Sequence, residues 1–289
     1  MEIETDVPLA RLTTIGTGGP ATAFARPGSV TELEEAIAWG AERGLEVRTV
    51  GLGSNLLAAD EGIDALVVRL AGDLAGVEID GELLRAGGGA TNAVCLHRAR
   101  DAGLGGLEFA CAIPGTAGGG VRMNAGAYGS DWSAILVRAL VVSAEGSGWL
   151  TPEELGLEYR HSCVRADQVV ARVEYRLVPK PVAEIKVEVA DLVARRKATQ
   201  PTNKRTFGSV FKNPPGELGA GRMLELCGLK GFALGGALVS PRHANFVENA
   251  GDATSEDCLG LLREARRRAH QQFGVDLEHE VVFLGSLTL

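Results

Sequence analysis

The feature that most constrains the fold is the glycine pair Gly51 and Gly53, in the segment Gly51-Leu52-Gly53-Ser54-Asn55-Leu56. Glycine lets a backbone turn tightly and direct several N–H groups toward one anion. The pair follows a strand predicted at 46–50, as in dinucleotide-binding proteins, but Leu56 stands where the third glycine of that motif would be. Residues 59–64 predict a turn into another strand, not a helix. The pattern argues against a Rossmann domain, and a glycine pair alone is more often an ordinary turn.

A second glycine-rich stretch covers residues 113–129, where small residues fill most positions. Such a stretch lets a planar ring and a pyrophosphate approach the main chain, and Thr116 and Asn124 offer side-chain donors. A structural loop packed against another backbone is the alternative. The two segments together favour a bound nucleotide.

Hydrophobic periodicity predicts an α+β chain with two parts. In the first part a capping box at Thr31 predicts a helix that stops at Gly44, and a second helix is expected at 91–102. Strands are expected at 46–50, 65–70, 83–86, 136–143 and 169–177. Pro179 and Pro181 cannot continue a strand ladder, so the boundary is placed there. The tail predicts helices at 182–197, 221–227 and 255–273, and strands at 209–211, 245–247 and 280–284.

Composition narrows the class of protein. A length of 289 residues suits two modest domains. The net charge of −8 disfavours nucleic acid as a partner, and the basic run 263–268 is expected to be a solvated helix face. The chain has no apolar run of bilayer length and begins with acidic residues, so we expect no membrane association and a cytoplasmic location.

Cysteine and histidine give no sign of a metal site. No Cys-x-x-Cys or His-x-x-x-His pair occurs, so a bound metal is not expected. The five scattered cysteines are expected to be buried, reduced thiols: Cys95, Cys111, Cys163, Cys227 and Cys258.

Seven motifs in one order resemble the UDP-N-acetylenolpyruvoylglucosamine reductases. They are Gly-Leu-Gly-Ser-Asn-Leu-Leu at 51–57, Ile-Pro-Gly-Thr at 113–116, Arg-Met-Asn-Ala-Gly-Ala-Tyr-Gly at 122–129, Tyr-Arg-His-Ser at 159–162, Gly-Ser-Val-Phe-Lys-Asn-Pro at 208–214, His-Ala-Asn-Phe at 243–246 and Leu-Glu-His-Glu-Val at 277–281. The resemblance covers nearly the whole chain. The short stretch between Arg160 and Ser209 is similar to the compact subclass of the family.

The resemblance implies a flavoenzyme. Residues 1–180 would form an α+β FAD-binding module of the flavin-oxidase (PCMH/VAO) type with tightly bound FAD, and residues 181–289 a smaller α+β substrate-binding domain. NADPH would reduce the flavin, which would then reduce UDP-N-acetylglucosamine enolpyruvate to UDP-N-acetylmuramate for peptidoglycan. A monomer is expected.

The family's catalytic residues match three positions of this sequence. Ser209 matches the proton donor, Arg160 the arginine that binds a carboxylate or enolate, and Glu280 the glutamate that assists the intermediate. A reduced enolpyruvyl group does need a cation and an acid within reach of carbon. Glu278 is the rival of Glu280, because residues two apart can face one side of a strand.

The remaining expected contacts follow the same motifs. FAD would be held by Gly51, Leu52, Gly53, Ser54, Asn55, Leu56, Pro114, Gly115, Thr116, Gly118, Gly119, Asn124, Ala125 and Gly126. Candidates for the substrate are Lys212, Asn213 and His243, with Arg195, Arg196 and Lys197 as less certain cations. Which residue closes over the substrate is left open.

This sequence departs from the family pattern at Cys163-Val164-Arg165, where an aromatic residue and a lysine are usual, and at Ala112, where a glycine is commoner. Neither departure touches an expected catalytic residue. Two other functions compete with the reductase: an alcohol oxidase on the same flavin module, and a non-catalytic flavin- or nucleotide-binding protein.

Overall fold

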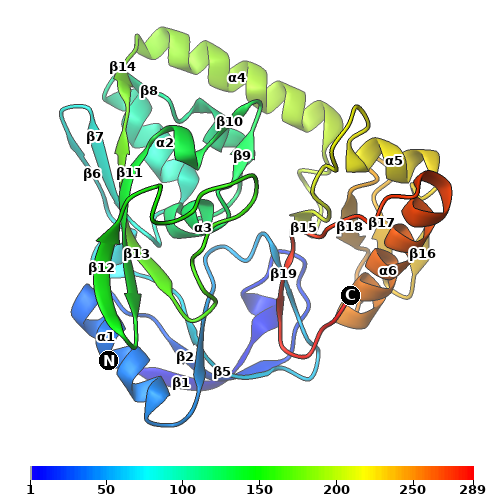
Figure 1. Cartoon of the computed structure of the whole chain (residues 1–289), viewed down its shortest axis with the longest axis horizontal. Coiled ribbons are helices and arrows are strands. Elements are labelled where there is room, and N and C mark those ends of the chain that lie inside the picture. The colour runs from blue at the N-terminus through cyan, green and yellow to red at the C-terminus, as the bar shows by residue number, and fades with distance from the viewer. Residues whose placement is uncertain (1) are drawn as a thin grey trace. The chain divides into compact units, whose positions relative to one another are not determined.

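The computed structural model describes residues 2–289 and has the expected α+β composition (Figure 1). The helices are α1 (Val30–Ala41), α2 (Asn92–Asp101), α3 (Ala117–Arg122), α4 (Val182–Thr199), α5 (Ala220–Leu226) and α6 (Ser255–Phe273). The strands are β1 (Ile3–Pro8), β2 (Pro20–Ala25), β3 (Glu46–Thr49), β4 (Leu56–Ala58), β5 (Ile63–Val68), β6 (Val77–Asp80), β7 (Leu83–Gly87), β8 (Leu104–Gly105), β9 (Gly126–Ala127), β10 (Ser130–Asp131), β11 (Leu136–Ser143), β12 (Gly146–Leu150), β13 (Val169–Arg176), β14 (Val178–Pro179), β15 (Thr206–Ser209), β16 (Ala233–Leu234), β17 (Ala237–Val239), β18 (Phe246–Asn249) and β19 (Val282–Leu284).

The chain forms two compact units that do not follow a single cut of the sequence. Of the described residues, the first unit comprises 2–5, 23–52 and 65–196, and the second comprises 6–22, 53–64 and 197–289. The functional division expected from the resemblance, with residues 1–180 binding FAD and 181–289 binding substrate, stays a prediction.

The first unit is built around a five-stranded antiparallel sheet of order β12-β11-β13-β7-β6 (Figure 1). Helices α2 and α3 pack against β6, β7 and β13. In the core, the indole Nε1 of Trp132 donates to the hydroxyl of Tyr175 at 2.5 Å, and Phe109 meets the Trp132 ring edge-on. The indole N–H and the phenol hydroxyl thereby have a hydrogen-bond partner inside an apolar core.

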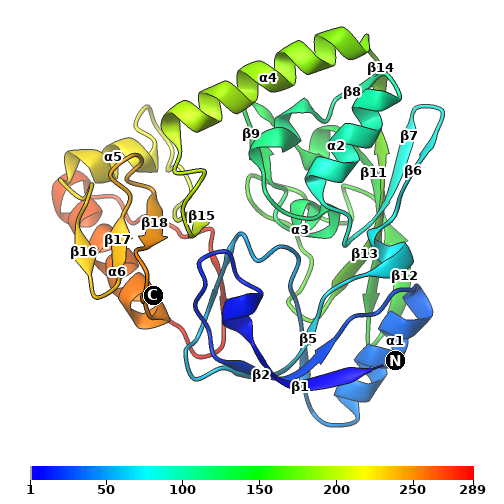
Figure 2. The ribbon, with the colours of Figure 1, turned by 180° about the vertical axis from the view of Figure 1, so that it is seen from behind.

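The second unit contains a four-stranded antiparallel sheet of order β15-β18-β17-β16. Figure 2 shows α6 beside β16, β17 and β18, and α6 also contacts α5. Thr254 and Asp257 form a capping box at the start of α6, and Gly274 ends the helix in the left-handed conformation. The parallel pair β4–β19 belongs to the same unit.

Several expected elements are confirmed, since β11 and α6 match the predicted residues and α2 begins after the Thr91 cap. Others were wrong in detail. The cap of helix α1 is Ser29, two residues before the expected cap Thr31, because the hydroxyl of Ser29 accepts from the Glu32 N–H. Strand β15 ends at Ser209 and does not begin there.

The cysteines are all free thiols, but they are not all buried as expected. Cys95 and Cys258 are buried, and burial raises the pKa of each to about 12. Cys111 and Cys227 are half-buried, and Cys163 is exposed. In residues 2–289 no helix is long and apolar enough to cross a bilayer.

A cross-strand charge cluster makes a prediction about acid stability. The guanidinium of Arg138 on β11 donates two hydrogen bonds, of 2.7 and 3.0 Å, to the buried carboxylate of Glu174 on β13. These bonds hold the pKa of Glu174 below its ordinary value of 4.5. A carboxylate with a lowered folded-state pKa stabilises the fold above its unfolded pKa, and this stabilisation is lost as the pH falls through the folded pKa.

Glu174→Gln should therefore lower the free energy of unfolding at pH 7 by about 1–2 kcal/mol. The difference from wild type should shrink as the pH falls below 4.5, because wild type then loses the same stabilisation. Urea unfolding at several pH values measures both effects. Glu78→Gln, on the exposed edge strand β6, is the control and should change little. A Glu174→Gln deficit that is constant from pH 7 to 3 would contradict this account.

Candidate functional site

In the first unit the two glycine-rich segments meet. A methyl group added at Gly51 would lie 2.6 Å from the hydroxyl oxygen of Thr116, so the close approach requires glycine there. Among residues 2–289, none accepts a hydrogen bond from the backbone N–H of Gly51, Leu52, Gly115 or Thr116. Backbone N–H groups without a protein acceptor can bind an anion, so we refer to these four residues as the anion cradle. Such groups could hold the phosphates of a dinucleotide, and that role stays a prediction.

The small residues after Thr116 serve two purposes. Gly118 and Gly120 are buried, and an added methyl group would lie 2.8 Å from the Val170 carbonyl oxygen and 2.7 Å from the Trp132 ring, respectively. Gly119 is exposed, with only the Thr116 hydroxyl near such a methyl, at 3.5 Å. Some glycines of this stretch therefore pack against the protein itself, and Gly119 leaves the backbone accessible, so the ligand-binding interpretation stays a prediction.

Asn124 is bonded at both ends of its amide. Its Nδ2 donates to the Glu158 carbonyl at 2.9 Å, and its Oδ1 accepts from the Ser133 N–H at 3.0 Å. The residue is buried and in the left-handed conformation. Its expected direct contact with FAD stays a prediction, whereas its structural role is to hold the turn that carries Arg160.

Arg160 occupies a tight turn between Glu158 and His161, whose backbones exchange two hydrogen bonds of 3.1 Å. Its φ of +54° is unusual for a residue with a side chain. The guanidinium Nη2 donates to the Gly126 carbonyl at 2.6 Å, and the group lies over the Tyr159 ring. Arg160 is thus fixed beside the expected FAD-binding segment.

In the second unit the structure brings Ser209 and Glu280 together. The Glu280 N–H donates to the Val210 carbonyl at 2.9 Å, next to Ser209. Gly208, at φ +82°, introduces an irregularity at the end of β15, and a methyl group on it would lie 3.3 Å from the Ser54 carbonyl. The Asn55 side chain donates to the Glu280 carbonyl at 2.8 Å. Residues 54–55 of the first glycine segment therefore adjoin both catalytic candidates of this unit.

Glu278 and Glu280 have different surroundings in the structure. Glu278 is exposed, and its carboxylate pairs with the Lys212 ammonium at 2.7 Å. Glu280 is half-buried and follows His279, whose ring stacks on Phe283. Sequence spacing could not distinguish the two glutamates, and the catalytic role given to Glu280 stays a prediction. Lys212, expected to bind substrate, has Glu278 as its partner here.

The other two substrate candidates also have roles within the second unit. The Asn213 side-chain oxygen accepts from the Ala220 N–H at 3.0 Å, at the start of α5. His243 lies against Gly221 and meets the Phe246 ring edge-on. Burial lowers the pKa of His243, and its Nδ1 accepts from the Asn245 N–H. At neutral pH it is therefore an uncharged imidazole with a hydrogen on Nε2.

Two supporting segments were missed in the sequence. The turn 88–90 accepts hydrogen bonds from the N–H groups of Gly118 and Ala117, of 2.9 and 2.8 Å. In the second unit Gly53 lies against the Leu12 backbone, where a methyl group would come within 1.9 Å of the carbonyl oxygen. The glycine clusters at residues 16–19 and 87–89 are the sequence signals that lie nearest to these two segments.

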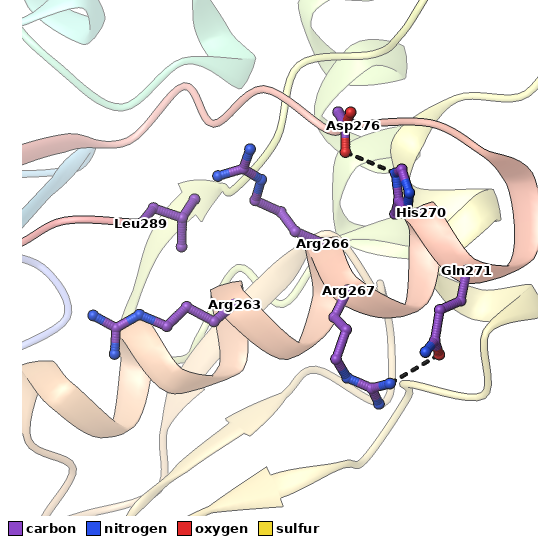
Figure 3. A pocket seen from close by; sticks show the side chains of 7 residues that line it. All are labelled: Arg263, Arg266, Arg267, His270, Gln271, Asp276 and Leu289. Atoms are coloured by element: carbon purple, nitrogen blue, oxygen red, sulfur yellow. Dashed lines mark hydrogen bonds and ion pairs between the residues drawn. The ribbon is translucent and has the colours of Figure 1, made fainter.

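A pocket on α6 is not part of this site. Its lining residues are Arg263, Arg266, Arg267, His270, Gln271, Asp276 and Leu289 (Figure 3). Arg263 pairs with Glu256, Arg267 with Glu264, and His270 with Asp276. These pairs agree with the expectation of a solvated helix face. Among residues 2–289, no three His, Cys, Asp or Glu side chains cluster closely enough to hold a metal ion.

Comparisons with known proteins bear on the whole chain. Residues 21–149 match a family model described as FAD binding domain, and residues 200–284 match UDP-N-acetylenolpyruvoylglucosamine reductase, C-terminal domain. UDP-N-acetylenolpyruvoylglucosamine reductase 2 of Symbiobacterium thermophilum is 43% identical over 280 residues, 96% of this chain and 91% of that protein. The reductase of Rubrobacter xylanophilus is 42% identical, over 97% of this chain and 94% of that protein.

A solved structure agrees with these relatives. The crystal structure of UDP-N-acetylenolpyruvylglucosamine reductase from Thermus caldophilus superposes with a TM-score of 0.86, at 36% identity, over 98% of this chain and 99% of that one. The resemblance inferred from the seven motifs is confirmed. The chain belongs to the UDP-N-acetylenolpyruvoylglucosamine reductase family.

Proposed function

We propose that this protein reduces the enolpyruvyl group of UDP-N-acetylglucosamine enolpyruvate to the lactyl group of UDP-N-acetylmuramate, with NADPH as reductant and FAD as cofactor. The observation that carries the proposal is a cluster of backbone contacts in one unit: the Glu280 N–H bonds the Val210 carbonyl beside Ser209, and the Asn55 side chain bonds the Glu280 carbonyl. Two residues of the family motifs thereby lie on neighbouring backbone segments, next to the end of the first glycine segment. Family membership supplies the substrate.

FAD would be held by the accessible N–H groups of the cradle, formed by Gly51, Leu52, Gly115 and Thr116. When bound, FAD accepts hydride equivalents from NADPH and passes them to the enolpyruvyl group. The remaining members of the expected FAD set, including Ser54, Leu56, Pro114 and Ala125, belong to the same two segments. Their contacts are proposals of the same kind.

The protein's own residues would handle charge and the proton. Hydride addition to the enolpyruvyl methylene puts negative charge on the carbon beside the carboxylate. The planar guanidinium of Arg160 suits that carboxylate as it takes up charge. The Ser209 hydroxyl would give its proton to the carbon, and the Glu280 carboxyl would assist the transfer. Lys212, Asn213 and His243 would bind the UDP-sugar, and we propose that the protein acts as a cytoplasmic monomer.

The first prediction concerns cofactor retention. Gly51→Ala places a methyl group 2.6 Å from the Thr116 hydroxyl and should displace one wall of the cradle. The FAD dissociation constant should rise at least about tenfold, the equivalent of losing one to two hydrogen bonds to a charged group. Gly148→Ala, where nothing lies within 4 Å, is the matched control. Titration of the apoproteins with FAD measures both constants, and equal dissociation constants in the two variants would contradict the cradle.

The second prediction separates the two half-reactions. Ser209→Ala should be bleached by NADPH at the wild-type rate, because the serine serves only the proton transfer to substrate. Anaerobic reoxidation by UDP-N-acetylglucosamine enolpyruvate should slow by about 100-fold or more, the usual contribution of a general acid. Stopped-flow absorbance of the flavin measures both rates. Ser147→Ala, on an exposed strand, should behave like wild type, and near-normal reoxidation of Ser209→Ala would refute the role.

The third prediction uses the two glutamates as a matched pair. Glu280→Gln should slow reoxidation at saturating substrate by about tenfold or more, because glutamine cannot take part in proton transfer. Glu278→Gln removes only the partner of Lys212, so it should change the substrate concentration required and leave the saturated rate near wild type. The reverse order of effects would assign the role to Glu278.

A further inference from the structure

We infer that Asn245 is a positioning residue for the proton-transfer half of the reaction, acting through the backbone of Phe211. This inference rests on the function proposed above, because it concerns the same Ser209–Glu280 cluster. Asn245 is buried and immediately precedes β18. It has no expected contact with substrate or cofactor.

The Asn245 side chain makes the two hydrogen bonds to Phe211 that a neighbouring strand would otherwise make. The ladder between β15 and β18 ends at the pair Ser209–Phe246. Beyond it, the Asn245 Oδ1 accepts from the Phe211 N–H at 3.0 Å, and its Nδ2 donates to the Phe211 carbonyl at 2.8 Å. A primary amide offers one acceptor and one donor, as a peptide group does. The side chain thereby bonds both backbone groups of Phe211, a residue that is itself buried.

The opposite edge of the same segment is bonded to the strand-like residues 278–280. The Glu280 N–H donates to the Val210 carbonyl, and the Lys212 N–H donates to the Glu278 carbonyl, both at 2.9 Å. Segment 210–212 is therefore held on two sides, by Asn245 on one and by the glutamate segment on the other. The Asn245 carbonyl also accepts from the Val210 N–H at 2.9 Å.

This arrangement determines where Ser209 and Glu280 lie. Ser209 directly precedes the clamped segment, and Glu280 is bonded to it. Without the amide, the buried N–H and carbonyl of Phe211 would lack partners, and the segment would move to find them. A shift of about 1 Å can change a rate by about 100-fold when a proton must pass between fixed groups. Flavin reduction by NADPH needs neither the serine proton nor this alignment.

The test compares two half-reactions in the FAD-loaded protein. Asn245→Ala should be reduced by NADPH within about twofold of wild type, whereas reoxidation at saturating UDP-N-acetylglucosamine enolpyruvate should slow by about tenfold or more. Asn249→Ala is the matched control. Its amide, at the other end of β18, bonds the Ile15 carbonyl and the Gly251 N–H, away from segment 210–212. This control variant should lower the midpoint temperature of unfolding, but it should not slow reoxidation more than reduction.

A second variant guards against loss of folding in the first. Asn245→Asp keeps the shape and the bond from the Phe211 N–H, but it presents a second acceptor to the Phe211 carbonyl. It should give the same selective loss of reoxidation. Reoxidation within twofold of wild type in either variant, or equal losses in both half-reactions, would overturn the inference. Wild-type protein that is reduced yet not reoxidised by substrate would instead overturn the proposed function.

Discussion

The hydrogen bond from the Glu280 N–H to the Val210 carbonyl joins two parts of the chain that are about 70 residues apart in sequence, and the candidate catalytic groups depend on it. Closing so long a loop costs conformational entropy that local contacts must offset. Several hydrogen bonds offset this cost. Segment 210–212 lies between the Asn245 amide and residues 278–280, and the Asn55 side chain bonds the Glu280 carbonyl. The backbone segments that carry the Ser209 hydroxyl and the Glu280 carboxylate are thus held together by hydrogen bonds.

Close backbone approach is the second constraint. Gly51 meets Thr116, Gly53 meets Leu12, and Gly118 meets residues 88 and 170, each at a distance that excludes a methyl group. Only a part of each glycine-rich segment is therefore available to a ligand. The rest brings distant parts of the chain together, and the N–H groups left without acceptors are the ones proposed to bind an anion. Asn124 illustrates the same division, since both ends of its amide support the Arg160 turn.

Much of the fold could be predicted because its signals are local. The Thr254 cap and the apolar spacing after it define α6, and a mostly apolar run rich in leucine and valine defines β11. The exclusion of a Rossmann domain depended on Leu56 and on the turn expected at residues 59–64, and the seven ordered motifs identified the family. Strand β15 was misplaced because Gly208, with its positive φ, introduces an irregularity that no periodicity reveals.

The supporting contacts could not be predicted because they are long-range. Spacing cannot show that Lys212 pairs with Glu278, or that an asparagine will substitute for a strand at Phe211. The second unit is likewise assembled from residues 6–22, 53–64 and 197–289, and nothing local in the sequence indicates that these segments pack together. The sequence motifs indicate the candidate catalytic residues, whereas the long-range hydrogen bonds show which backbone segments hold them in place.

The central claim is that one flavin passes its reducing equivalents to an enolpyruvyl carbon. The most direct measurement is an anaerobic single turnover of the wild-type protein, reduced by one equivalent of NADPH and then mixed with UDP-N-acetylglucosamine enolpyruvate. The account predicts full return of the oxidised flavin spectrum and one equivalent of UDP-N-acetylmuramate per flavin. A flavin that stays reduced until oxygen is admitted, with the enolpyruvyl compound recovered unchanged, would contradict it.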